Sequence, residues 1–156
     1  MTDETAEERA LGYFHRGFSC AQSTFAALSP LTGIEETTSL KLASAFGAGL
    51  GRMRGTCGAF SALCMAAGLR SGNTEGTVEG KQRIYEETRR LAAEFRAAFG
   101  TLLCRELLHL PEGQEEAPRP ETRTEAYYAA RPCERCIAFC ARRAARLLQE
   151  AEEIRA

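Results

Sequence analysis

The chain has 156 residues and a mass of 17.0 kDa, the size of one domain. Its formal net charge of -1 gives no positive field that would favour nucleic acid or an anionic membrane as a partner. Hydrophobic residues make up 44% and charged residues 26%, which excludes a disordered chain. One Val and four Ile stand against sixteen Leu and 26 Ala, a composition that favours helices over a sheet. We therefore expect a single all-α domain over residues 1–156.

No signal peptide and no membrane-spanning segment are recognisable in this sequence. The start, Met1 to Glu4, is acidic and lacks the basic and apolar regions of a signal peptide. The longest nearly apolar stretch, residues 57–69, is too short to cross a membrane. We therefore expect a cytoplasmic protein with no membrane span and no nucleic-acid partner.

Two helices are expected at the beginning of the chain. Residues 4–16 carry apolar side chains at helical spacing, and Gly17 suits a left-handed stop. Ser19 and Gln22 then fit a capping box that opens a second helix. This helix is expected to stop before Pro30, because the residue before a proline avoids the helical conformation.

The middle of the chain predicts the centre of the fold. Residues 35–46 form a third expected helix, and the four glycines within residues 47–56 indicate a loop. The loop is not a phosphate-binding motif, since Arg52 replaces the third glycine and no strand precedes it. Thr56 can cap a fourth helix over residues 57–69. That helix is apolar on nearly every face, which predicts a central, buried position.

The second half of the chain predicts a long helix, a loop and a long final helix. An apolar stripe and alternating charges mark residues 78–99 as amphipathic. A short helix follows at residues 102–108, after Thr101 as its cap, and residues 111–125 form a polar, Pro-rich, solvated loop. One more turn is expected at residues 127–130. The last helix runs over residues 132–153, with Pro132 in its first position, which completes a bundle of five to six helices around residues 57–69.

Seven cysteines are the most informative feature of the composition, and their odd number excludes complete intramolecular pairing. Four of them lie in the first turn of a predicted helix: Cys20, Cys57, Cys104 and Cys133. The N–H groups and positive dipole of a helix start lower a thiol pKa toward about 3.5–7.5. A thiolate is both the nucleophile of redox exchange and a metal ligand. We expect the Cys20, Cys57 and Cys104 sulfurs to cluster.

Cys57 is expected to be the most acidic thiol. It combines a helix start with an open glycine loop and with Arg52 and Arg54 shortly before it. Arg105 is expected to act on its neighbour Cys104 in the same way. These positions favour a functional role over simple packing.

The last helix carries three cysteines on one face, because Cys133, Cys136 and Cys140 are spaced three and four residues apart. Cys133 and Cys136 form a CxxC pair, which serves dithiol exchange at a helix start or metal ligation beside a second pair. Cys140 and Cys64 lie in the middle of helices among apolar residues. For these two cysteines, packing as small hydrophobic side chains is the better interpretation.

The order and context of the cysteines resemble a family of redox-active proteins named for its cysteine pattern, C_GCAxxG_C_C. Its members have a Cys, then a Cys-Gly-Ala-x-x-Gly box, then two further cysteines. Here Cys20 is the first, Cys57-Gly58-Ala59 opens the box, and Cys104 follows. The box ends in Ala62 instead of Gly, which changes the space available to a packed helix.

This resemblance covers about residues 5–150 and implies a helical fold with a redox role for four cysteines. For the fourth cysteine we favour Cys136 over Cys133 or Cys140. The resemblance names no substrate and no electron donor.

Three functions are therefore weighed. The first is a thiol-based redox protein that uses Cys20, Cys57, Cys104 and Cys136, with a redox partner protein or a small thiol as its partner. The second is a zinc or iron–sulfur binding module without catalysis, and the third is a bundle whose cysteines are inert. A homo-oligomer is left open. The candidate ligands of the second function are Cys20, Cys57, Cys104, Cys133 and Cys136.

Overall fold

The computed structural model describes residues 1–155, and it describes side chains up to residue 150. The described chain is all-α, which confirms the predicted fold class; its one β-type contact is an isolated bridge between Thr56 and Leu103. Six helices have eight or more residues, in agreement with the five to six expected. They are α1 (Asp3–His15), α2 (Cys20–Ala27), α4 (Glu36–Ala43), α6 (Gly58–Ser71), α7 (Val78–Phe99) and α10 (Cys133–Arg155).

Shorter segments connect these helices. A 3-10 turn, η1 (Ser44–Phe46), extends α4. The others are α3 (Ser29–Thr32), α5 (Gly47–Leu50), α8 (Cys104–Leu107) and α9 (Glu125–Ala129). None of the helices in the described part of the chain is long and apolar enough to cross a bilayer.

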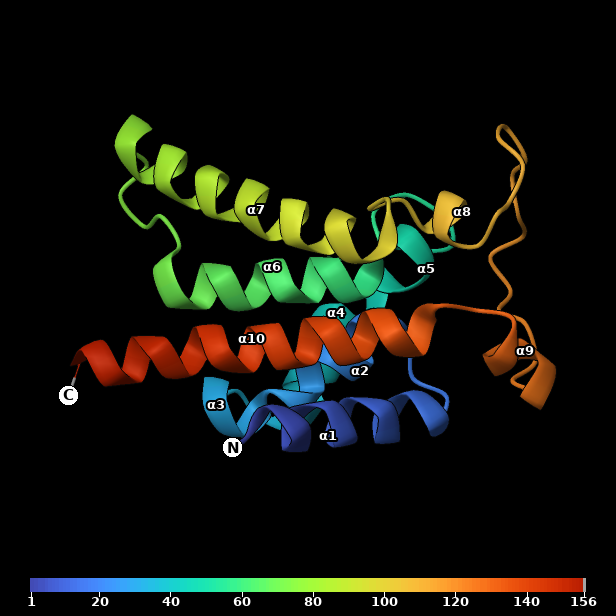
Figure 1. Ribbon diagram of the computed structural model, residues 1–156, viewed down its shortest axis with the longest axis horizontal. Helices are drawn as coiled ribbons and strands as arrows, with labels where there is room; N and C mark the ends of the chain where they lie inside the picture. Colours follow the sequence, from blue (N-terminus) through green and yellow to red (C-terminus); the bar gives the residue numbers. More distant parts are fainter. Residues whose placement is uncertain (156) are drawn as a thin grey trace.

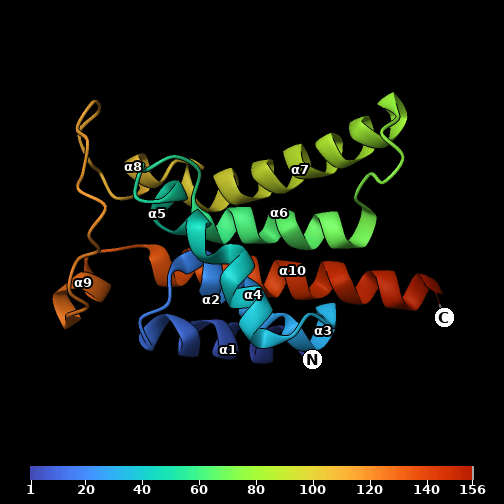
Figure 2. The ribbon, with the colours of Figure 1, turned by 180° about the vertical axis from the view of Figure 1, so that it is seen from behind.

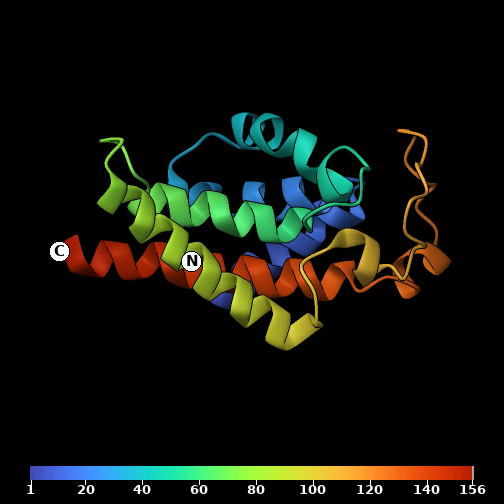
Figure 3. The same cartoon turned by 90° about the horizontal axis from the view of Figure 1, so that it is seen from above.

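The long helices are stacked side by side. Figure 1 shows α7, α6, α10 and α1 as successive layers, while α2 and α4 lie behind α6 and α10 and come to the front in Figure 2. The view from above separates α4 on one side of α6 from α7 on the other (Figure 3). The short segments α5, α8 and α9 gather at one end of the stack, where α6 and α10 begin.

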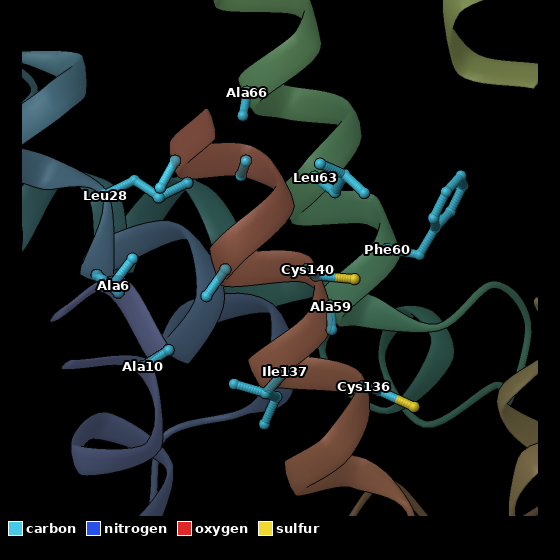
Figure 4. Packing of buried hydrophobic residues seen from close by; sticks show 14 of the residues in the cluster. Ala6, Ala10, Leu28, Ala59, Phe60, Leu63, Ala66, Cys136, Ile137 and Cys140 are labelled. Atoms are coloured by element: carbon cyan, nitrogen blue, oxygen red, sulfur yellow. The ribbon is translucent and has the colours of Figure 1, made fainter. Parts of the chain in front are cut away.

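The core lies between α6 and its neighbours, as expected for the central helix. Ala59 and Leu63 lie on the side of α6 that faces α10, and Cys140 projects toward them from α10 (Figure 4). Leu63 and Ile137 are fully buried, which stabilises the fold by about 1.5–3 kcal/mol each. The small alanines let the two helix backbones approach closely. The central position is shared, because α10 also packs on α1.

Several predicted helix ends are confirmed. Ser19 and Gln22 form the capping box of α2, and Gly17 adopts the left-handed conformation with φ of 97°. The helix α7 has the predicted bounds and ends at Gly100, whose φ is 86°. Local chemistry alone therefore fixes these ends.

The predicted starts of three cysteine-bearing helices are wrong by one or two positions. Cys57 is itself the N-cap residue of α6, because Thr56 is held in the bridge to Leu103. Cys104 is the first residue of α8, and the Thr101 hydroxyl accepts a hydrogen bond from the Leu103 N–H instead of capping the helix. Helix α10 begins at Cys133, one residue after the predicted Pro132.

Candidate functional site

One pocket of about 510 Å³ lies at the end of the stack where α6 and α10 begin (Figure 1). It collects side chains from the starts of α2, α6, α8 and α10. These are the cysteines that the sequence singled out as redox or metal candidates, namely Cys20, Cys57, Cys104, Cys133 and Cys136. Cys64 and Cys140 do not line this pocket. The fold therefore brings together residues that are more than 100 positions apart in sequence.

Two thiols of the pocket are neighbours. The Cys136 thiol acts on the pKa of Cys57 through a side-chain interaction, although the two residues come from different helices. Both are almost inaccessible, with 6% and 1% of their surfaces exposed. A pair of neighbouring thiols is the simplest arrangement from which a disulfide can form.

The Cys20 sulfur lies close to the start of α6, at a position where the helix has a glycine, Gly58. A Cβ atom at Gly58 would lie 2.7 Å from the Cys20 sulfur and 2.6 Å from the Phe46 carbonyl oxygen. Only glycine leaves room for the sulfur at this point. Gly47 does the same for the start of α2, because a Cβ there would lie 2.5 Å from Cβ of Ser19.

The expectation that Cys57 is the most acidic thiol is wrong. The neighbouring Cys136 thiol, followed by burial, raises the Cys57 pKa well above its ordinary value. The backbone N–H groups of Ala59 and Phe60 act in the opposite direction but are outweighed. The N–H groups at the helix start do favour a thiolate, but the neighbouring Cys136 thiol and the loss of hydration together outweigh them.

Burial also dominates at Cys20. It raises the pKa of Cys20, and the nearby Cys57 raises it further. Backbone N–H groups from three separate segments lower it: those of Ala21, Ala48 and Ala59. These donors come from three segments, so a thiolate formed at Cys20 during a reaction would be stabilised by N–H groups that are already in place.

A guanidinium group reaches only one of these sulfurs in the described structure, that of Cys104. Arg54 donates to the Cys104 sulfur at 3.6 Å, and its own side chain is 4% exposed. Burial raises the pKa of Cys104, and Arg54 lowers it. The sequence predicts that Arg54 acts on Cys57. This prediction is wrong, because Arg54 lies against the sulfur of Cys104 instead. Arg105 is also redirected, because it donates to the carbonyl oxygen of Pro111.

A carboxylate holds the arginines in place. The Glu116 Oε2 atom accepts hydrogen bonds from Arg54 Nε at 3.0 Å and Nη2 at 2.8 Å, and from Arg52 Nη2 at 2.8 Å. These two guanidinium groups lower the pKa of Glu116, Arg54 more strongly than Arg52. Glu116 belongs to the segment predicted as a solvated loop. No local pattern in the sequence indicates that Glu116 reaches back to residues more than 60 positions earlier.

The loop before α6 coils in the left-handed sense to present these arginines. Its four non-glycine residues with positive φ are Ala48, Leu50, Arg52 and Arg54, with φ between 55° and 71°. Each such residue costs about 1–2 kcal/mol. Backbone hydrogen bonds hold the coil, from Arg54 N–H to the Ala48 carbonyl oxygen and from Gly55 N–H to that of Gly49. A loop was predicted here, but strain at non-glycine positions was not.

Residues 111–124 cover one side of the pocket. Arg131 pairs with Glu121 at 2.7 Å, and Arg123 donates to the carbonyl oxygens of Phe14 and Phe18 at 3.1 Å. Pro118, Pro120, Glu121 and Arg123 belong to the pocket lining. The segment is helix-free, as expected, but its inner side chains are tied to the bundle and shape the site.

Metal binding was the alternative interpretation of the same cysteines. Among the described residues, no group of three or more Cys, His, Asp or Glu side chains is arranged so that it could hold a metal ion. All seven cysteines are free thiols, in line with a site that can change its oxidation state.

The fold and the pocket define a class: a helical protein that gathers cysteines from separate helix starts into one site. The sequence of residues 18–147 matches the family described as "Putative redox-active protein (C_GCAxxG_C_C)". The match covers most of the chain, so the protein belongs to this family, which supports a redox role. No curated protein and no solved structure matches the chain.

Proposed function

We propose that the protein is a thiol-based redox protein whose pocket cysteines cycle between a dithiol and a disulfide. The neighbouring positions of Cys57 and Cys136 in one pocket are the observation that carries this proposal. Cys20 and Cys104 line the same pocket and are the candidates for passing oxidising equivalents to that pair. Membership of a redox-active family supports the same conclusion.

The reaction is thiol–disulfide exchange. One cysteine of the protein, as a thiolate, attacks a sulfur of an oxidised disulfide substrate, and one substrate thiol leaves. A second cysteine then attacks the mixed disulfide, and the other substrate thiol leaves. Two S–H groups of the protein are oxidised, one substrate S–S bond is reduced, and the two protons go to the released thiols.

The surroundings distinguish the two candidate entry points. Cys104 has the Arg54 guanidinium against its sulfur, and Cys20 has three converging backbone N–H groups. Both arrangements stabilise a thiolate better than the pair of Cys57 and Cys136, where a thiol has another thiol as its neighbour. We therefore assign attack on the substrate to Cys104 or Cys20. Cys57 then attacks the sulfur of that cysteine and releases the second substrate thiol, and Cys136 attacks the Cys57 sulfur, which frees the first cysteine as a thiol and leaves the disulfide between Cys57 and Cys136.

The test is oxidation of the reduced protein with diamide, a small neutral oxidant, followed by mass spectrometry. We expect a loss of two mass units, reversed by reductant, with Cys57 and Cys136 joined in the peptide map. The Cys136→Ser variant is expected to lose this bridge. The matched control, Cys64→Ser, removes a cysteine outside the pocket and is expected to keep it. An unchanged mass in the wild type would overturn the proposal.

The metal alternative is decided on the same sample. Stoichiometric zinc or iron in anaerobically purified protein, with no change in mass on oxidation, would support it instead. We also propose a cytoplasmic location, because a protein that returns to the dithiol form needs a reducing compartment.

A further inference from the structure

We propose that the pocket binds a low-molecular-weight disulfide with an apolar, aromatic body and a carboxylate group, and that this is the oxidant of the dithiol. The inference rests on the proposed function and names its substrate class. Three features of the pocket support it: its size and closure, its apolar lining, and its surplus of positive charge.

Size and closure favour a small molecule over a protein. A volume of about 510 Å³ lies within the range of small-ligand sites, about 300–1,000 Å³. Cys57 and Cys104 are 6% and 8% exposed, and Cys136 is 1% exposed. A small disulfide reaches these three sulfurs more readily than the disulfide of a folded protein, because the attacked bond must come within contact distance while the rest of the protein stays outside.

The lining suits an apolar body. Phe14, Leu107, Leu108 and Tyr127 contribute apolar or aromatic side chains to the pocket, and Pro118 adds another from the covering segment. These side chains line the same pocket as the cysteines. A disulfide that carries aromatic rings fits such a lining better than a strongly hydrated one.

Positive charge at the arginine cluster exceeds negative charge. Arg52 and Arg54 both line the pocket and share the single carboxylate of Glu116. Two guanidinium groups facing one carboxylate leave one positive charge uncompensated. This charge lies beside Cys104, to which Arg54 donates.

A second uncompensated charge comes from the covering segment. Arg123 lines the pocket and donates to two carbonyl oxygens, and within the described side chains no carboxylate lies within ion-pair distance of it. Its guanidinium group lies over the ring of Phe14, 4.4 Å from the ring centroid. Arg131, by contrast, is matched by Glu121. The pocket therefore attracts an anion.

The thiols of the pocket do not compensate the positive charge of these arginines. Burial raises the pKa values of Cys20, Cys104 and Cys133, so these groups are neutral at pH 7. The surplus is therefore available to a bound carboxylate. In the reaction, two protein S–H groups and one aromatic disulfide give one protein disulfide and two aromatic thiols.

The experiment compares two chromogenic aromatic disulfides, the anionic dithiobis(nitrobenzoate) and the neutral dithiodipyridine. Each rate of thiol release from the reduced, folded protein is divided by the rate with the same protein unfolded in urea, which cancels intrinsic reactivity. We expect this normalised rate to be about tenfold higher for the anionic probe at low ionic strength. The preference is expected to disappear near 1 M salt, where charges are screened beyond about 3 Å.

Variants locate the effect. Arg123→Gln is expected to reduce the preference severalfold, whereas Arg83→Gln, an equal charge change at an exposed position of α7, is expected to leave it unchanged. If Arg123→Gln fails to fold, the salt dependence of the wild type still decides. Equal normalised rates for the two probes, or a preference that persists in high salt, would overturn the inference.

Failure of the inference is distinguishable from failure of the proposed function. If diamide produces the protein disulfide but the anionic probe has no advantage, the redox function stands and the substrate class is wrong. If neither diamide nor the neutral probe yields a protein disulfide, the redox function itself fails.

Discussion

The guanidinium group of Arg54 donates a hydrogen bond to the sulfur of Cys104 while the rest of its fork is held by Glu116. A buried cation against a sulfur stabilises the thiolate, and it opposes the burial that raises the Cys104 pKa. We therefore expect the balance between Arg54 and burial to set the reactivity of Cys104.

Arg54→Gln is expected to raise the pKa of Cys104, because burial then acts with little opposition. The midpoint of the Cys104 alkylation rate against pH, followed by peptide mass spectrometry, should move upward. Arg105→Gln is the matched control: Arg105 neighbours Cys104 in sequence, but its guanidinium group bonds to carbonyl oxygens of Pro111 and Gln114. An unchanged midpoint in Arg54→Gln would show that the contact has no effect on the thiol.

Gly58→Ala is expected to destabilise the fold by about 1–3 kcal/mol, since the added Cβ would overlap the Phe46 carbonyl oxygen and the Cys20 sulfur. Gly68→Ala provides the control in the same helix. A Cβ at Gly68 meets nothing within 4 Å, so alanine is expected to stabilise by about 0.5–1 kcal/mol. Urea unfolding measures both. If both variants gain stability, the Phe46 carbonyl oxygen and the Cys20 sulfur do not approach residue 58 closely enough to exclude a side chain.

Ala48→Gly is expected to stabilise the protein. Relief of the left-handed conformation at Ala48 gains about 1–2 kcal/mol, and the greater freedom of glycine in the unfolded chain costs about 0.4–1 kcal/mol. The net gain is therefore between about 0 and 1.6 kcal/mol. Ala45 is exposed, lies within η1 and has no left-handed conformation to relieve. Ala45→Gly therefore only increases the freedom of the unfolded chain and is expected to destabilise the protein. Thermal unfolding that ranks the two variants in the opposite order would contradict this.

Stability is expected to fall as pH rises above about 8.5 in anaerobic, reduced samples. Burial raises the pKa of Cys64 to about 11 and that of Cys133 to about 12, so the folded state keeps protons that the unfolded thiols lose near pH 8.5. This contribution is fully present below the unfolded pKa and is lost as pH climbs toward the folded values. Urea midpoints between pH 7.5 and 10.5 test it.

The control for this pH dependence is Cys64→Ala, which removes one buried thiol. Its stability is expected to decline less steeply with pH than that of the wild type. A flat stability profile in the wild type would mean that the thiols titrate alike in the folded and unfolded states.

Much of the fold could be predicted because it follows local rules. The capping box at Ser19 and the left-handed ends at Gly17 and Gly100 depend on neighbouring residues only, and they are found as predicted. The buried centre followed from the all-round apolar character of the segment that forms α6. Helix periodicity and capping need no knowledge of the rest of the molecule.

The site could be predicted only in part, because its details depend on contacts between distant segments. Helix-start reasoning selected cysteines that line the pocket, yet it missed that the Cys136 thiol and burial would outweigh the helix dipole at Cys57. It also missed that Arg54 would turn to Cys104 and that Glu116 would hold it there. The reaction roles of the individual cysteines remain predictions.

The bridge between Thr56 and Leu103 joins the two chain segments that carry Cys57 and Cys104. Cys57 N–H donates to the Leu102 carbonyl oxygen, and Cys104 N–H donates to that of Gly55, so main-chain atoms fix the spacing of these cysteines. Side chains at positions 56 and 103 can therefore vary without moving either sulfur. A single-residue deletion ahead of Leu103, by contrast, would shift the pairing and turn Cys104 away from the pocket. Length, more than residue identity, is what this segment must preserve.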